Sequence, residues 1–132
     1  MLYRDAIKLA TEKLLTDPKV LVVGQGVTDF KRMWGTLPDI GSGLDAQLIE
    51  APLSEDSVAG MCLGLALAGY YPINTHIRAD FSLLAFNQII NVGAKYKYMF
   101  DGDFTMPSLF RLVVGRSWGQ GAQHSQSFHS LL

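Results

Sequence analysis

The first residues that could do chemistry stand directly before an apolar run. Ser54, Glu55 and Asp56 precede a stretch of small and apolar residues, 58–71, that carries no charge. Because this stretch predicts a buried helix, Glu55 would stand at the N-terminal end of that helix, with apolar residues behind it. A carboxylate in such a place loses hydration and suits a group that shares a proton with a ligand. A simple helix cap, with Ser54 as N-cap and both acids favoured by the helix dipole, is the more frequent meaning of this spacing.

Composition limits the class of protein. The chain has 132 residues, of which 48% are hydrophobic and 17% charged, enough for one domain with a real core. This balance is more apolar than in most lone soluble domains, so we expect a large subunit interface. A net charge of -1 favours neither nucleic acid nor an anionic membrane, and the apolar stretch 58–71 is too short to span a bilayer. Cys62 is the only cysteine, which excludes an intrachain disulfide and predicts a reducing, cytoplasmic setting.

The apolar patterns predict helices and strands in alternation. Helices are expected over 2–15, from Glu55 through 71, and over 80–98 and 125–132, and strands over 20–23, 47–51, 73–77 and 109–114. Such alternation predicts one α/β domain over 1–132, with a mainly parallel sheet flanked by helices. Ligands of these sheets bind beyond the carboxyl ends of the strands. Each candidate residue follows an expected strand and should gather along one edge: Gln25, Glu55, Phe81 and the loop before His124.

Seven short blocks, in a consistent order and spacing, carry a resemblance to a known family. They read YRDAI at 3–7, PLSE at 52–55, ALAGYYP at 66–72, DFS at 80–82, NQIIN at 87–91, KYKYM at 95–99 and GAQHSQS at 121–127. No single block is decisive, but together they are specific. The chain resembles the pyrimidine-binding domain of thiamine-diphosphate enzymes. In particular, it is similar to the beta subunit of the E1 component of 2-oxo acid dehydrogenase complexes, of the pyruvate and branched-chain type.

The resemblance implies roles for five residues. Glu55 would hydrogen-bond the pyrimidine ring of thiamine diphosphate and stabilise the imino tautomer that removes a proton from the thiazolium ring. Phe81 would stack on the pyrimidine face, and Leu53 and Gln25 would add further cofactor contacts. His124 would face the substrate and the reacting carbon as a donor or base. Judged without the resemblance, Phe81 is more often a core residue and His124 a loop histidine bonded to backbone.

The chain departs from the family pattern in two places. The usual Gly-Glu-Asp or Gly-Glu-Glu after the first strand is replaced here by 24–26, in which Gln25 keeps the hydrogen-bonding shape but not the charge. The usual Gly-Gly after block 95–99 is replaced by 100–103, whose acids favour a solvated turn over a metal site. His76 and His129 match no family role, and we expect both to be structural.

The resemblance also implies partners. Family beta subunits continue beyond this point into a second domain, so 1–132 is expected to be incomplete at its carboxyl end, with an exposed sheet edge or apolar face. An E1 alpha subunit would hold the diphosphate and its Mg²⁺, and this chain would hold no metal. Other partners would be further beta subunits in a heterotetramer, a lipoyl-bearing E2 component and the 2-oxo acid. Gly60, Gly64 and Ala68 share one helical face, which favours packing on a subunit and packing on the chain's own sheet about equally.

Functions from different classes stay open. One is part of an active dehydrogenase that decarboxylates a 2-oxo acid and transfers the acyl group to lipoyl-lysine, with the chain inactive by itself. Another is a non-catalytic assembly or remnant domain of the same fold. Enzymes of the transketolase type are a third, because they share the glutamate, but the block around His124 favours the dehydrogenase.

Overall fold

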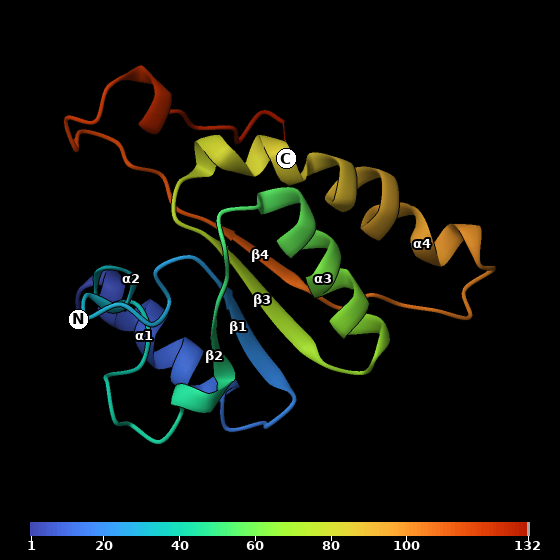
Figure 1. Ribbon diagram of the computed structural model, residues 1–132, viewed down its shortest axis with the longest axis horizontal. Helices are drawn as coiled ribbons and strands as arrows, with labels where there is room; N and C mark the ends of the chain where they lie inside the picture. Colours follow the sequence, from blue (N-terminus) through green and yellow to red (C-terminus); the bar gives the residue numbers. More distant parts are fainter. Residues whose placement is uncertain (132) are drawn as a thin grey trace.

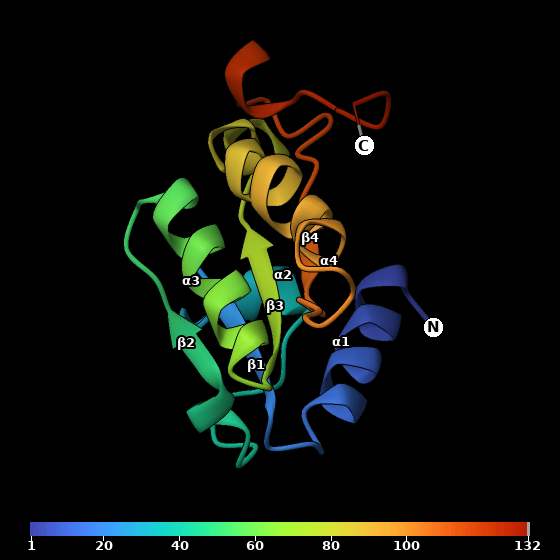
Figure 2. The same ribbon diagram turned by 90° about the vertical axis from the view of Figure 1, so that its right-hand side faces the viewer.

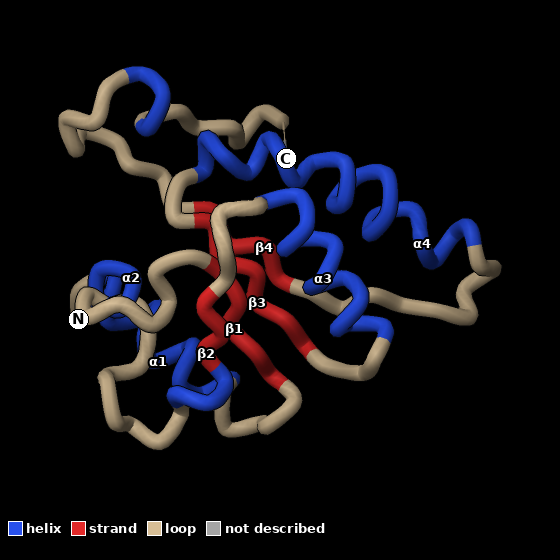
Figure 3. The backbone as a smooth tube through the Cα atoms, in the orientation of Figure 1, coloured by secondary structure: helices blue, strands red, loops and turns tan. Residues whose placement is uncertain are grey.

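A sheet of four strands forms the centre of the computed structural model, which describes residues 1–131 (Figure 1 and Figure 3). The strands lie in the order β2-β1-β3-β4, and every neighbouring pair is parallel. Their bounds are β1 Val20–Gly24, β2 Leu48–Glu50, β3 Tyr71–His76 and β4 Leu109–Leu112. The expected parallel α/β sheet flanked by helices is confirmed.

Helices cover both faces of this sheet (Figure 2). On one face lie α1 (Tyr3–Leu14) and the short α2 (Arg32–Gly35). On the other lie α3 (Glu55–Leu67) and a continuous helical run made of η2 (Ala79–Ala85), η3 (Asn87–Gly93) and α4 (Ala94–Met99). Single turns of 3-10 helix, η1 (Asp45–Gln47) and η4 (Ala122–His124), complete the elements.

Strand β1 is buried on both faces, and its alternating side chains divide the core in two. Val22 packs on the α1 side with Leu15 and Met33. Val23 packs on the α3 side with Val58 and other residues. Val22 and Val23 are both 0% exposed, so each contributes roughly 1.5–3 kcal/mol of hydrophobic free energy. A continuous β-branched run is typical of a strand in this position.

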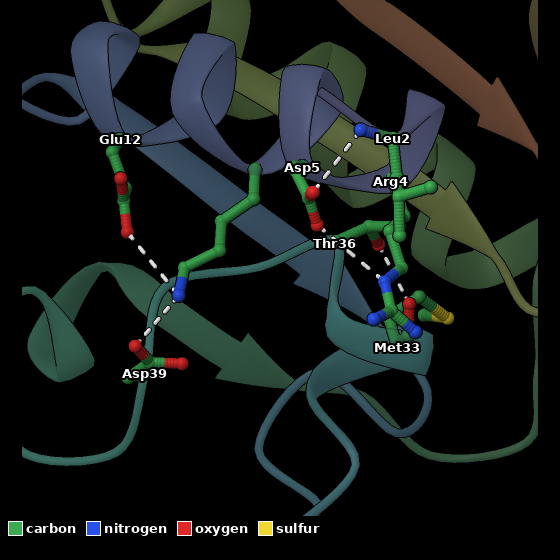
Figure 4. Close-up of polar contacts among 8 residues, drawn as sticks. Leu2, Arg4, Asp5, Glu12, Met33, Thr36 and Asp39 are labelled. Carbon is green, nitrogen blue, oxygen red and sulfur yellow. Dashed lines mark hydrogen bonds and ion pairs between the residues drawn. The ribbon is translucent and has the colours of Figure 1, made fainter.

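α1 is held to the rest of its layer by polar contacts at its surface (Figure 4). Lys8 Nζ lies 2.6 Å from Asp39 in the loop after α2 and 3.9 Å from Glu12 one turn further along the helix. At the start of the helix, the Leu2 N–H donates to Asp5 Oδ2 at 3.2 Å, which satisfies one unpaired backbone donor. Exposed pairs of this kind contribute little free energy, so they orient α1 rather than stabilise it.

The loop between β1 and β2 contains a turn of left-handed helix that sequence patterns do not predict. The φ angles of Arg32, Met33, Trp34 and Gly35 are 45°, 50°, 57° and 73°. Each L-residue in this region costs about 1–2 kcal/mol, whereas glycine adopts it freely. Burial offsets this cost, because Met33 is 2% exposed within the core and the buried Arg32 forms an ion pair with Asp45.

Two expected helices differ from the structure. The helix expected over 80–98 is divided into a 3-10 segment, a π-helical segment and a short α-helix over 94–99. The helix expected over 125–132 is wrong for residues 125–131, which form bends, turns and irregular chain, and Leu132 lies outside the described residues. Three serines in this stretch compete for backbone hydrogen bonds, and its apolar residues are too few to form a helical stripe.

Several large apolar side chains are exposed on the layer formed by η2 and η3. Leu83, Leu84 and Ile90 are 43%, 60% and 43% exposed. This matches the apolar surface expected from composition, while the subunit that would cover it stays a prediction. None of the described helices is both long and apolar enough to cross a membrane.

The end of β1 leaves no room for a side chain. Gly24 pairs with Thr75 of β3, and a Cβ on Gly24 would lie 2.2 Å from the Thr75 carbonyl oxygen. That distance is far inside van der Waals contact, and the obstacle is backbone that cannot rotate away. Glycine is therefore required for β1 and β3 to approach at their carboxyl ends.

We predict that Gly24→Ala lowers the free energy of unfolding by at least about 2 kcal/mol, because the methyl group forces two paired strands apart. Urea unfolding of the chain measures the change. Gly64→Ala is the matched control, since nothing lies within 4 Å of an added Cβ in the middle of α3. This control should gain roughly 0.5–1 kcal/mol. Equal stability of Gly24→Ala and the parent chain would contradict the prediction.

Candidate active site

A cleft opens at the carboxyl ends of β1 and β3, beside the first turn of α3. The space between its walls, open solvent included, is about 300 Å³. Three of the residues predicted from the sequence, Glu55, Phe81 and Gln25, line it together. This is the strand edge at which ligands bind in parallel α/β sheets.

Glu55 is the first residue of α3, and it reaches the cleft because β2 and the short link after it end there. The carboxylate is half-buried, and Val58 and Ala59 behind it are 7% and 0% exposed. Ser54 stands at the N-cap position, but its side chain makes no capping hydrogen bond. The hydroxyl cap expected from the spacing is therefore absent from this helix, whereas its apolar wall is present.

Gln25 follows β1 directly and turns toward the link that carries Glu55. Its Nε2 donates to the Pro52 carbonyl oxygen at 3.3 Å. The side chain is half-buried, and both Gln25 and Pro52 contribute to the cleft wall. The amide therefore ties the end of β1 to the start of α3 across the cleft.

Phe81 and His124 come from distant parts of the chain and pack against each other. The His124 ring in η4 meets the Phe81 ring in η2 edge to face, with centroids 5.2 Å apart and planes at 82°. A backbone contact supports this pair, because the Gln126 N–H donates to Asp80 Oδ1 at 3.1 Å. The sequence-predicted gathering of Glu55, Phe81, Gln25 and His124 at one edge is thus what the structure shows, with His124 beside the cleft wall.

Leu53 differs from the other predicted residues. Its side chain is 81% exposed, and it is absent from the cleft wall, although its neighbour Pro52 belongs to that wall. Its cofactor contact stays a prediction.

The end of β3 supplies polar wall residues that sequence reasoning missed. Asn74, Thr75 and His76 are 1%, 2% and 5% exposed, and all three line the cleft. Asn74 Nδ2 donates to the Val23 carbonyl oxygen at 3.3 Å, so its Oδ1 is free to accept from His76 Nε2, 2.8 Å away. The signal in the sequence is a polar run inside a strand whose other residues are apolar.

His76 and Thr75, at the end of β3, differ in their surroundings. Burial lowers the pKa of His76, and the charge of Glu55 raises it, with burial the larger effect. The neutral imidazole is therefore favoured, and His76, expected to be structural, is also part of the cleft. Thr75 Oγ1 is buried and has no hydrogen-bond partner among the described residues.

Comparison with known proteins identifies the family of this domain. A family model described as "Transketolase, pyrimidine binding domain" matches residues 1–130. The chain belongs to this family. Thiamine diphosphate is in general the cofactor of its members.

Relatives of this pyrimidine-binding domain include beta subunits of dehydrogenases. The chain is 37% identical over 131 residues to the mitochondrial pyruvate dehydrogenase E1 component subunit beta of Homo sapiens, covering 95% of this chain and 35% of that protein. It is 36% identical over 124 residues to the corresponding subunit of Porphyra purpurea, covering 92% and 38%. It is 35% identical over 136 residues to acetoin:2,6-dichlorophenolindophenol oxidoreductase subunit beta of Cupriavidus necator, covering 92% and 40%.

Two facts limit what these relatives imply. The chain spans 35% to 40% of the length of these three relatives. The human relative is mitochondrial, so the expected cytoplasmic location stays a prediction.

Within residues 1–131, no group of three or more His, Cys, Asp or Glu side chains is placed to hold a metal ion.

Glu50, at the end of β2, is a further residue that sequence reasoning did not single out. Its carboxylate accepts from the Gly26 N–H at 2.6 Å and from the Thr28 N–H and hydroxyl at 3.0 and 2.9 Å. Burial raises the pKa of Glu50, but the hydrogen bonds from Thr28 and Gly26 together outweigh burial and hold this pKa below its usual value. Glu50 thereby fixes the loop that follows Gln25 in this pyrimidine-binding domain.

We predict that Glu50 makes stability pH-dependent in the acid range. Because its native pKa lies below the ordinary value of 4.5, the stabilisation is present above that pH and is lost as the pH falls through the native pKa. Glu50→Gln should lose about 1 kcal/mol at neutral pH, a value reduced for solvent exposure, and should flatten the decline in acid. Urea unfolding across the pH range measures both effects, with Glu12→Gln on α1 as the control. Parallel pH profiles for Glu50→Gln and the parent would refute this assignment.

Proposed function

We propose that this domain binds the pyrimidine half of thiamine diphosphate in the cleft and forms part of the beta subunit of a 2-oxo acid dehydrogenase E1 component. The reaction would be oxidative decarboxylation of a 2-oxo acid, with transfer of the acyl group to lipoyl-lysine. The observation that carries this proposal is that Glu55 and Phe81 line one cleft and His124 packs against Phe81. The named relatives support the same class of subunit.

The residues that line the cleft suit the chemistry of an aminopyrimidine. Such a ring is flat and has hydrogen-bonding groups on its edge, so it needs an aromatic surface and polar partners at the rim. Phe81 offers the surface and Glu55 the carboxylate, both from the same wall. Thr75 adds a buried hydroxyl that has no hydrogen-bond partner among the described residues, and a polar atom of the ring is one group that could pair with it.

The residues of this chain would act by holding or transferring protons and by keeping the cleft residues in position. When bound, the cofactor supplies the nucleophilic carbon that attacks the 2-oxo carbonyl. Glu55 would hold or release a proton at the ring edge, backed by the buried start of α3. His76, oriented by Asn74 and favoured in its neutral form by burial, would place no positive charge beside the Glu55 carboxylate. His124 would act at the open side as a donor or base toward the substrate.

Partners are part of the proposal. The relatives are named as beta subunits, which supports an E1 alpha subunit as a partner. The diphosphate and Mg²⁺ are assigned to that alpha subunit as part of the proposal. Further beta subunits, a lipoyl-bearing E2 component and the 2-oxo acid complete the set. The exposed apolar residues of η2 and η3 are available for subunit packing. By itself, the chain is proposed to be inactive.

A second substrate is worth testing beside pyruvate. The Cupriavidus necator relative is named for acetoin, so turnover of acetoin by the assembled enzyme is a specific alternative. A non-catalytic assembly domain is the remaining alternative. Absence of turnover with both substrates would favour it.

We predict that Glu55→Gln lowers turnover by at least ~10²-fold in the full-length subunit assembled with an alpha partner, because a proton-transfer group is lost. The substitution is nearly isosteric, so the assembly should be kept. Asp56→Asn is the matched control: it removes one charge from the same helical turn but lies outside the cleft wall. A rate of decarboxylation near that of the parent enzyme in Glu55→Gln would contradict the proton-transfer role of Glu55.

We predict that Phe81→Ala weakens binding of thiamine diphosphate by about 1–3 kcal/mol, through lost stacking and lost apolar burial. Calorimetric titration of the assembled enzyme gives the affinity directly. Phe30→Ala, which removes a phenylalanine that is 79% exposed and lies outside the cleft wall, should leave it unchanged. An unchanged affinity in a folded Phe81→Ala variant would identify Phe81 as a core residue only.

A further inference from the structure

Arg78 lines the cleft and also forms a cluster with Trp34 and Trp118, which lie outside the cleft wall. Its guanidinium carbon lies 4.8 Å from the ring centroid of Trp34 and 4.8 Å from that of Trp118. The two indole rings are 4.9 Å apart and tilted by 49°. Arg78 is 8% exposed, so these cation–π contacts are shielded from water and stronger than on an open surface.

Hydrogen bonds give Arg78 a second link to the glycine-rich loop, residues 115–121. Its Nε donates to Gln120 Oε1 at 2.8 Å, and its Nη2 donates to the same oxygen. Its Nη1 donates to the Ile77 carbonyl oxygen at 2.7 Å, which fixes the side chain against its own strand end. The planar guanidinium can satisfy these directions and stack on aromatic rings simultaneously, which an ammonium group cannot.

The glycine-rich loop has little internal means of holding its shape. Gly119 and Gly121 have φ angles of 69° and 77°, and glycine has the widest conformational freedom of any residue. Trp118 is 43% exposed, and it contacts Trp34 and Arg78 in the cluster described above. The loop leads directly into η4, which carries His124. An anchor on this loop therefore affects where His124 stands.

Three anchors of the loop and of η4 come from one short segment after β3. Arg78 holds Trp118 and Gln120, and the Phe81 ring meets His124. Asp80 Oδ1 accepts from the Gln126 N–H, two residues after His124. Of these anchors, only the cluster of Arg78 reaches the opposite layer of the domain, through Trp34 of α2.

We propose that Arg78 is a positioning residue for His124: its contacts with Trp34, Trp118 and Gln120 hold the glycine-rich loop so that His124 stays packed on Phe81. The catalytic consequence rests on the proposed function, because it requires His124 to act on the substrate. The structural consequence does not, and the two can be tested separately.

The first experiment uses the 132-residue chain and needs no activity. Trp34 and Trp118 are its only tryptophans, so tryptophan emission, excited selectively over the five tyrosines, reports on the cluster. Its three histidines can be followed by proton NMR, in which the Phe81 ring shifts the His124 signals. Arg78→Met keeps the aliphatic stem and removes the charge. We expect it to red-shift the emission and to move the His124 signals toward those of a free histidine.

Control variants distinguish the loss of the Arg78 contacts from general unfolding of the chain. Arg116→Met changes an exposed arginine on the same loop and should alter neither signal. Gln120→Ala removes the contact from the exposed side of the loop, so it tests the same link should the buried Arg78→Met variant unfold. Far-UV circular dichroism establishes which variants are folded.

The second experiment measures steady-state kinetics of the full-length subunit assembled with its alpha partner. Arg78→Met should lower kcat roughly 10-fold, the scale of one lost cation–π anchor, with KM and cofactor affinity little changed. Trp34→Leu should lower kcat in the same way although Trp34 is not part of the cleft wall. Arg78→Lys should recover only part of the loss, because lysine lacks the planar fork.

Each outcome decides the proposal. Unchanged emission and His124 signals in folded Arg78→Met or Gln120→Ala overturn it. So does a shifted spectrum with unchanged kcat, and so does a rise in KM alone, which would indicate that Arg78 contacts the substrate directly. If the parent enzyme shows no turnover and Glu55→Gln has no effect, the proposed function fails. The spectra then still decide whether Arg78 holds His124 on Phe81.

Discussion

The backbone contact between Gly24 and Thr75 is the constraint on which the rest of the site depends. The carboxyl ends of β1 and β3 meet there with no side chain between them. Gln25 leaves β1 one residue later, and His76 ends β3 one residue later. Both strand ends therefore deliver polar residues to one cleft while the rest of the sheet keeps its apolar layers. A wider spacing would separate the two walls and expose the polar end of β3 to solvent.

The candidate site was only partly predictable from the sequence. Glu55 could be found because a carboxylate before an uncharged helix is visible as a pattern, and Phe81 and His124 because short blocks resemble a family. The same reasoning could not find Arg78, Asn74 or His76. Their significance comes from partners that are distant in the chain, such as Trp34 and Gln120 for Arg78. Leu53 shows the opposite case: a block match predicts a contact, whereas the side chain stands in solvent.

The fold was predictable where burial and periodicity agree. The strand at 20–23 and the helix after Ser54 are long apolar patterns with clear ends, and both are present. The expected helix over 125–132 relied on a few apolar residues among serines, and local side-chain bonding prevailed; the Ser127 hydroxyl lies against His129 Nδ1. The 3-10 and π segments between 79 and 93 pack against α3, and such tertiary contacts are not contained in any single-sequence pattern.

The left-handed turn at Arg32–Gly35 has a consequence for the order of folding. Every L-residue in it opposes the local preference of the chain, so the turn cannot act as an early nucleus as a right-handed helix can. It becomes favourable only when Met33 enters the core and Arg32 meets Asp45. The cluster built on Trp34 must therefore form late, after the sheet and α1 have closed around it. In this chain, the parts of the site would mature from the strands outward, with the His124 loop last.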